Sequence, residues 1–104
     1  MVYNVEVTDF AFGQLDHYLD YIINELMNPE AAANVLDDFD EAIHDLKVSA
    51  GAFKPCDEPE LAEHGYRKYN LKRHRYILLY RLIDQDVFID RIYHELQDYQ
   101  NLEA

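Results

Sequence analysis

The sequence predicts an α+β fold in which one antiparallel-rich sheet carries a helical hairpin on one face. Two amphipathic helical stripes fill residues 10–27 and 29–48, and three strand-like segments follow one another between Gly65 and His94. A further strand-like segment opens the chain, so the order is βααβββ. Because two helices separate the first strand from the others, the economical arrangement is one sheet with the helix pair packed on it. At 104 residues and 49% hydrophobic content, we expect one domain, residues 1–104.

The first strand and the first helix are predicted from two different periodicities. Residues 2–7 alternate, with Tyr3, Val5 and Val7 on one side, which is typical of a short strand. Thr8-Asp9 then supplies a helix cap. Between residues 10 and 27, apolar side chains recur at intervals of three and four and predict one buried stripe. This stripe consists of Phe12, Leu15, Leu19, Ile22, Ile23 and Leu26.

The second helix begins at Asn28-Pro29-Glu30, where Asn is the N-cap, Pro takes the first helical position and an acid lies in the first turn. So short a connection predicts an antiparallel hairpin that ends near Ser49. The stripe of this helix is Ala32, Val35, Leu36, Phe39, Ile43 and Leu46. We expect the hairpin to bury eight side chains against the sheet: Leu15, Leu19, Ile22, Leu26, Val35, Leu36, Phe39 and Ile43.

The remaining chain is predicted as a loop followed by three strands. Residues 52–63 contain two prolines and four acids and form a loop, with one helical turn near residues 60–62. The run from Arg75 to Ile83 is almost continuously apolar, which predicts a central strand covered on both faces. Residues 84–86 turn the chain, and 87–93 form a neighbouring antiparallel strand with one wetter face. Beyond it, Leu96, Tyr99 and Leu102 predict a short C-terminal helical turn.

Charge is divided unevenly along the chain, whose formal net charge is -12. Residues 1–63 hold 15 acids and 2 lysines (net -13), whereas residues 64–104 hold 6 acids and 7 basic residues (net +1). Only the C-terminal third is therefore suited to approach a nucleic acid backbone. No run is long and apolar enough to span a membrane, and the start lacks the features of a signal peptide, so we expect a cytoplasmic protein without a membrane partner.

Neither a metal nor another cofactor is expected. The single cysteine, Cys56, forms no cluster and has Asp57 and Glu58 as neighbours, which do not favour a reactive thiolate. His17 and His64 have carboxylates nearby but no second histidine at ligand spacing, so a solvated surface explains them better than a metal site.

Four motifs, in this order and spacing, carry a resemblance to a known family. They are NP.AA at the start of the second helix, GYRKY from Gly65, RYILLYRL from Arg75 and I.RIYH..QDY from Ile89. With the βααβββ order, they cover nearly the whole chain, which resembles the RelE/ParE family of bacterial toxins. The resemblance implies the toxin half of a type II toxin–antitoxin pair, a growth inhibitor neutralised by a cognate antitoxin. RelE-like members cut mRNA in the ribosomal A site without a metal, and ParE-like members poison DNA gyrase.

The nuclease branch implies two catalytic candidates. Cleavage of RNA through its own 2′-hydroxyl needs a proton acceptor, cations at the phosphate and an acid for the leaving oxygen. Arg67 matches the family's phosphate-facing arginine, and His94 lies where some nuclease members carry a histidine. A solvated strand arginine and a histidine at a strand end are the alternatives. Arg81, Arg91, Tyr93 and Tyr99 are further candidates for contacts with a phosphate or a target; core packing or a snorkelling side chain is the alternative for these.

Two departures from the nuclease pattern favour the ParE-like branch. The loop before Gly65 holds only one cation, Lys54, among several acids, and His94 is followed by Glu95. A ribosome-bound nuclease needs cations at these places, because RNA presents phosphate on every side. We therefore expect a protein-docking poison of the topoisomerase type. The alternatives are a metal-independent ribosome-dependent mRNA endoribonuclease and a degenerate family member without toxicity.

Overall fold

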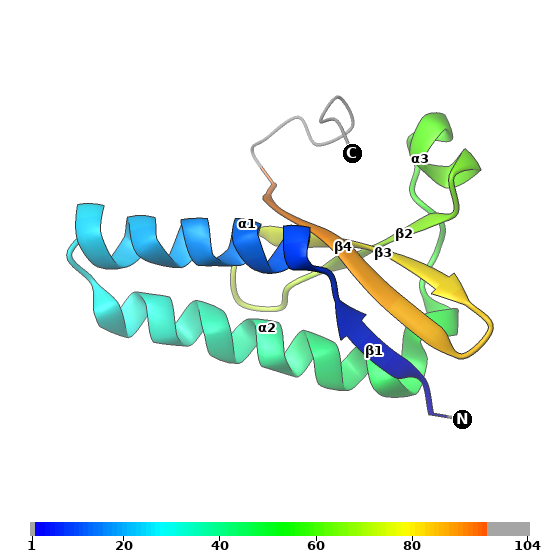
Figure 1. Ribbon diagram of the computed structural model, residues 1–104, viewed down its shortest axis with the longest axis horizontal. Helices are drawn as coiled ribbons and strands as arrows, with labels where there is room; N and C mark the ends of the chain where they lie inside the picture. Colours follow the sequence, from blue (N-terminus) through cyan, green and yellow to red (C-terminus); the bar gives the residue numbers. More distant parts are fainter. Residues whose placement is uncertain (1, 96–104) are drawn as a thin grey trace.

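The computed structural model, which describes residues 2–95, has the predicted α+β architecture: a four-stranded sheet of order β1-β4-β3-β2 with a helical hairpin on one face (Figure 1). β1 runs parallel to β4, and the other neighbours are antiparallel. The elements are β1 (Asn4–Val7), α1 (Asp9–Asp20), the π-helix η1 (Tyr21–Glu25), α2 (Pro29–Ser49), the 3-10 helix η2 (Ala50–Ala52), α3 (Pro59–Glu63), β2 (Tyr66–Asn70), β3 (Tyr76–Ile83) and β4 (Asp86–His94).

Both hairpin helices begin where the capping residues predict. The Thr8 hydroxyl accepts a hydrogen bond from the Ala11 N–H at 3.3 Å, and the Asn28 side-chain carbonyl accepts one from the Ala31 N–H at 3.1 Å. Each bond satisfies one of the backbone donors that a helix start leaves without a partner. The predicted helical turn near residues 60–62 is also present, as α3.

α1 lies along the part of β4 that β1 does not reach. β1 pairs only with residues 86–89 of β4, so the next stretch of β4 would expose unpaired backbone groups. The Gln14 side chain accepts from the Ile92 N–H at 2.8 Å, and the Tyr18 hydroxyl accepts from the His94 N–H at 3.3 Å. Four residues of helix rise about 6 Å and two residues of strand about 6.6 Å, so the two spacings match. The edge of β4 is thereby closed by a helix.

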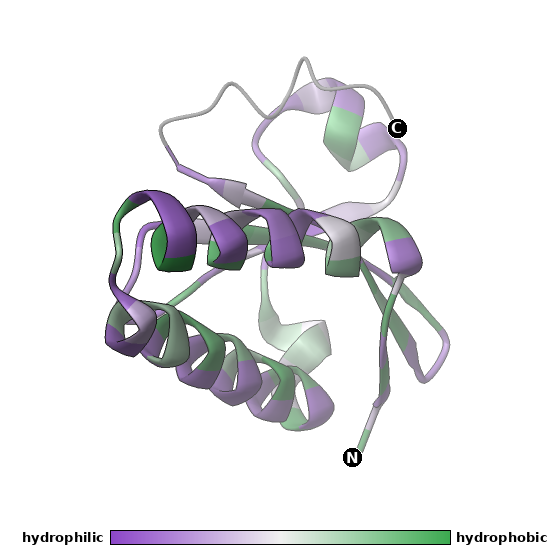
Figure 2. Cartoon of the chain, turned by 60° about the vertical axis from the view of Figure 1, so that its left-hand side comes forward, coloured by the Kyte–Doolittle hydropathy of each residue, from purple (hydrophilic) through white to green (hydrophobic). Residues whose placement is uncertain are grey.

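The main core lies between the hairpin and the sheet, where the apolar sides of both face each other (Figure 2). Tyr80, in the centre of β3, is fully buried, and its hydroxyl donates to the Ala50 carbonyl at 2.7 Å. The other side of the sheet carries a smaller buried cluster of Cys56, Ile77, Leu79 and Tyr93, against which Leu61 of α3 and Tyr66 pack. β3 is therefore covered on both faces, as predicted.

The predicted core of the hairpin is confirmed in part. Leu15, Ile22, Val35 and Phe39 are buried, and Leu19 and Ile43 pack against the core while partly exposed. The prediction was wrong for Leu26 and Leu36, which are 56% and 40% exposed. Two further members of the predicted stripe, Phe12 and Ile23, are also exposed.

The two errors have separate causes. The core stripe of α2 consists of Ala32, Val35, Phe39, Ala42 and Leu46, and Leu36 lies about 100° around the helix from Val35. Ala42 thus occupies a core position that a pattern of large apolar side chains does not reveal. In the first helix, the π-turn of η1 adds a residue to the last turn and changes the helical phase before Leu26.

Candidate functional site

A β-bulge in β4 sets the chemistry of the sheet face opposite the hairpin. Leu79 of β3 is opposite Arg91, and Tyr80 is opposite Ile89, so Asp90 is an extra residue in β4. Because of this extra residue, Asp90 and Arg91 both belong to the face away from the hairpin, whereas regular alternation would separate them. The bulge therefore brings two adjacent residues, Asp90 and Arg91, to the same face of the sheet.

Arg81 and Asp90 form a cross-strand ion pair on this face. The Arg81 Nε and Nη2 atoms donate to the two carboxylate oxygens of Asp90, at 2.5 and 3.3 Å, and the guanidinium carbon lies 5.3 Å from the centre of the Phe88 ring. Tyr66 also lies beside Asp90, and its pKa is raised, first by burial and then by the Asp90 charge. The positive charge of Arg81 is thus already neutralised within the chain.

Arg91 lies on the same face as Arg81 but in a different environment. Its side chain is buried, with 8% exposed, and its guanidinium carbon lies 4.1 Å from the centre of the Phe10 ring in the first turn of α1. Among residues 2–95, no carboxylate forms an ion pair with it. Tyr93, two residues on, is buried in the smaller cluster; burial raises the pKa of its hydroxyl, and a hydrogen bond from Gln14 opposes that shift.

The structure does not bring the two catalytic candidates together. Arg67 donates from Nη1 to the carbonyls of Phe53 at 2.6 Å and Gly51 at 3.3 Å, which fixes η2 and the residue that follows it. The His94 ring packs edge-on against Tyr76, with ring centres 5.3 Å apart.

The strand register gives the separation of these two residues. Arg67 is opposite Tyr80, and His94 is opposite Tyr76, on the two sides of β3. Four residues along a strand and two strand spacings across the sheet place their backbones about 16 Å apart. General acid–base partners must each lie within about 3 Å of the group they serve. Arg67 and His94 are therefore poorly placed to act on one phosphodiester. Tyr99 lies outside the described residues.

A second charged region, which the sequence did not reveal, joins the loop between β2 and β3 to α2. Asp38 of α2 is only 2% exposed, and its Oδ2 accepts from the Arg73 N–H and from His74 Nδ1, both at 2.9 Å. Arg73 also pairs with Glu41. Burial opposes ionisation of Asp38, but the hydrogen bonds from His74 and Arg73 outweigh it, and the pKa of the carboxyl is lowered. In the sequence, the basic run Lys72-Arg73-His74 and the acidic second helix could together have indicated this region.

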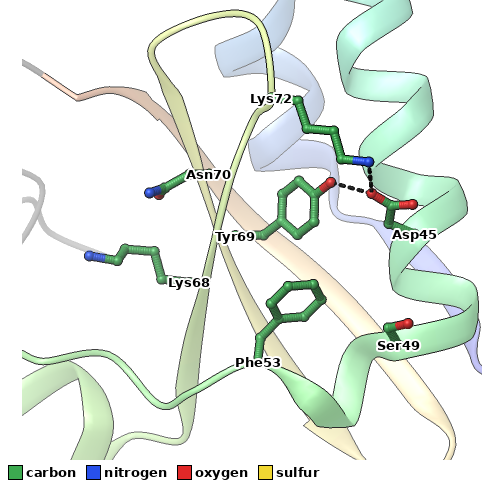
Figure 3. Close-up of a pocket in the computed structure, with 7 residues that line it drawn as sticks. All are labelled: Asp45, Ser49, Phe53, Lys68, Tyr69, Asn70 and Lys72. Atoms are coloured by element: carbon green, nitrogen blue, oxygen red, sulfur yellow. Dashed lines mark hydrogen bonds and ion pairs between the residues drawn. The ribbon is translucent and has the colours of Figure 1, made fainter.

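A shallow pocket lies beside this region, between α2 and the edge strand β2 (Figure 3). The Tyr69 hydroxyl donates to Asp45 at 2.5 Å, and the Lys72 ammonium pairs with the same carboxylate at 3.1 Å. Burial and the hydrogen bond to Asp45 raise the pKa of Tyr69. With these groups bound to one another, the pocket contributes to folding and offers no poised acid or base. Its lining is Asp45, Ser49, Phe53, Lys68, Tyr69, Asn70 and Lys72.

Two kinds of feature are absent from the described part of the chain. No group of three or more His, Cys, Asp or Glu side chains is arranged to hold a metal ion there. None of the helices in residues 2–95 has the length and apolar character needed to cross a membrane.

Comparison with known proteins gives one family and several solved structures. The family described as "ParE toxin of type II toxin-antitoxin system, parDE" matches residues 5–99. A structure of the chromosomal ParDE system from P. aeruginosa is similar with a TM-score of 0.73 and 24% identity, covering 89% of this chain and 96% of that one. At this identity the likeness shows the fold. A RelBE2 toxin–antitoxin complex from Mycobacterium tuberculosis is similar with a TM-score of 0.58 and 28% identity, covering 90% and 99%. No curated protein sequence gives a significant match.

Proposed function

Since the chain belongs to the ParE toxin family of type II toxin–antitoxin systems, we propose that it arrests growth by docking onto a type II topoisomerase such as DNA gyrase. The observation that carries the choice of target is the placement of Arg67 and His94. The guanidinium of Arg67 is held by two backbone carbonyls, and His94 lies about 16 Å away across the sheet. A ribosome-dependent nuclease would need both at one phosphate.

The charge of the chain supports the same choice. A formal net charge of -12 repels ribosomal RNA and mRNA at long range. Of the cations in residues 67–91, four are paired with carboxylates of the chain itself: Lys72, Arg73, Arg75 and Arg81. Few positive charges are therefore left for phosphates, whereas a protein target does not require them.

We also propose a cognate antitoxin as the neutralising partner. Both similar structures come from toxin–antitoxin systems, one described as ParDE and the other as a RelBE2 complex. We expect an antitoxin segment, an amphipathic helix or a strand, to cover part of the surface between Arg67 and Arg91. Hydrogen exchange of the complex tests this placement, and protection confined to residues 37–45 of α2 would contradict it.

The target is tested by comparing two activities of the same protein. After induction in a bacterial host, we expect growth arrest, and with purified gyrase we expect loss of DNA supercoiling. Primer extension on a reporter mRNA should show no codon-phased cleavage. If the chain docks, His94→Ala reduces toxicity only as far as it loosens an interface. If the chain is a nuclease, removal of a proton-transfer group should cost about 10² to 10⁴-fold in rate.

The outcomes distinguish three possible functions of this chain within the family. Codon-phased cuts in the ribosomal A site that disappear in both Arg67→Ala and His94→Ala would show the RelE-like nuclease, for which the likeness to a RelBE2 complex is the specific observation. Absence of growth arrest together with unaffected gyrase would show a degenerate member without toxicity.

A further inference from the structure

Arg91 is a buried cation without an anionic partner among residues 2–95. Moving a charge from water into a protein interior is costly unless the charge is paired and hydrogen-bonded. The nearest acid along the chain, Asp90, is bound by both nitrogens of Arg81 and lies beside Tyr66. In the described part of the chain, Arg91 has only the Phe10 ring as a specific contact. Within residues 2–95, the Phe10 ring therefore offsets part of the cost of burying this cation, and no acid offsets the rest.

The guanidinium of Arg91 remains within reach of an incoming group. Arg91 keeps 8% of its surface exposed, so part of the residue stays accessible from solvent. The Phe10 ring, which covers one side of the group, is itself 52% exposed. An approaching side chain therefore meets an apolar ring beside a recessed cation.

The first turn of α1 strengthens the attraction for an anion at this place. Phe10 lies in that turn, directly after the N-cap Thr8 and Asp9, and a helix start carries a partial positive charge. Asp9 is exposed and forms no ion pair with Arg91 in the described residues. The buried, unpaired guanidinium and the helix start act on the same small region.

We propose that Arg91 and Phe10 form a receptor for one carboxylate, supplied by an Asp or Glu side chain of the antitoxin next to an apolar residue that covers the Phe10 ring. This inference rests on the proposed function for the identity of the partner. A carboxylate fits because a guanidinium presents two parallel N–H donors that match its two oxygens. A nucleic acid phosphate is disfavoured, because a polyanion meets the repulsion of the whole chain, with its net charge of -12, whereas one carboxylate does not.

The first arm of the test measures antitoxin binding by calorimetry with the full chain. Arg91→Gln should weaken binding about 30-fold or more, since truncating one partner of a buried charge pair acts at that scale. Arg91→Lys should recover only part of the affinity, because lysine keeps the positive charge but lacks the two parallel N–H donors of a guanidinium. Lys47→Gln removes the same charge from an exposed position of α2 and should bind like wild type.

The melting temperature of each isolated variant separates binding from folding. Arg91→Gln should melt at or above the wild-type temperature, because it removes an unpaired buried charge, and Arg91→Met is the second variant for the same measurement. A fall in melting temperature in both variants would show an internal partner for Arg91 and overturn the proposal.

The second arm needs no antitoxin. In the ¹⁵N-labelled chain, sodium acetate should shift the Arg91 Nε–H resonance to saturation, and sodium chloride at equal ionic strength should not. The Arg81 Nε–H, already bound to Asp90, is the internal control and should not move. A shift with inorganic phosphate and none with acetate would overturn the choice of carboxylate.

The two arms fail in different ways. If wild type binds the antitoxin and Arg91→Gln binds it equally well, the receptor is overturned and the proposed partner stands. If acetate shifts Arg91 but the antitoxin does not bind, the antitoxin proposal fails and the anion site stands. Loss of affinity in Arg91→Gln with an unchanged melting temperature supports both.

Discussion

Among the described residues, each side of the sheet buries one charged residue, Asp38 on the side of the hairpin and Arg91 on the other, and the two sides accommodate it differently. Asp38 receives hydrogen bonds from the Arg73 backbone and from His74, both in the loop that joins β2 to β3. Arg91 has the face of Phe10 and, among the described residues, no acid. A buried charge with partners completes a fold, and one without them indicates where another molecule completes the site.

The same contrast appears in the packing. On the hairpin side, one continuous apolar core is formed by residues of both helices and of the strands. The other side holds a cluster of four buried residues, against which Leu61 of α3 packs. The energy of folding therefore comes mainly from the first side. The second side carries the bulge and Arg91, and a smaller part of the core depends on it.

The largest expected effect tests the packing on the hairpin side. Phe39→Ala should lower the free energy of unfolding by about 3 to 5 kcal/mol, since the ring is 2% exposed and its loss leaves a cavity. Leu36→Ala is the matched control on the same helix, and because Leu36 is 40% exposed it should cost about 1 kcal/mol. Urea unfolding with a common m-value measures both. Equal losses would place Leu36 in the core after all.

Phe39 and Leu36 also show how much of the fold and its core could be predicted from the sequence. Caps, helix periods and the run of strands predicted the fold, because each depends on residues close together in the chain. Periodicity by itself selected Leu36 and overlooked Ala42, since it weighs size and not the close approach that alanine allows. Burial of Asp38 escaped prediction because its partners lie 35 and 36 residues further on.

A smaller effect is expected from the buried acid itself. Asp38→Asn should destabilise the chain by about 1 to 3 kcal/mol, because the loop loses a charged acceptor for the Arg73 N–H and His74. The pKa of Asp38 is lowered in the folded state, so its contribution is complete above the unfolded value of about 3.9 and is lost as the pH falls through the lower folded value.

The pH dependence gives the control for that substitution. The stability difference between wild type and Asp38→Asn should be constant near neutral pH and shrink as the pH falls below about 4. Asp45, whose pKa is lowered chiefly by the hydrogen bond from Tyr69, remains in both proteins and keeps part of the acid sensitivity. Thermal melting of both proteins at a series of pH values measures this stability difference. A difference that persists at pH 2 would assign the loss to packing and not to charge.

The candidate site was predictable as a set of residue types but not as an arrangement. The predicted strands 75–83 and 87–93 placed Arg81 and Arg91 in the sheet, but they did not predict that Arg81 pairs with Asp90 at a bulge. Nothing in the local sequence predicts an extra residue in one strand, because it depends on the register with β3. The distance between Arg67 and His94 likewise follows from the strand order, which places them on the two sides of β3.

The smallest expected effects come from arginines, and they test most directly whether Arg91 has a partner within the chain. Arg81→Gln should cost about 1 kcal/mol, since it leaves Asp90, whose side chain is 13% exposed, without its bidentate partner. Arg75→Gln removes the same charge from an exposed pair with Glu95 and should cost at most about 0.5 kcal/mol, less in high salt. Arg91→Gln should cost nothing. Urea unfolding of the three at low and high salt ranks them. If Arg91→Gln lost as much as Arg81→Gln, the chain itself would have to supply an acceptor, and the difference between the two sides would disappear.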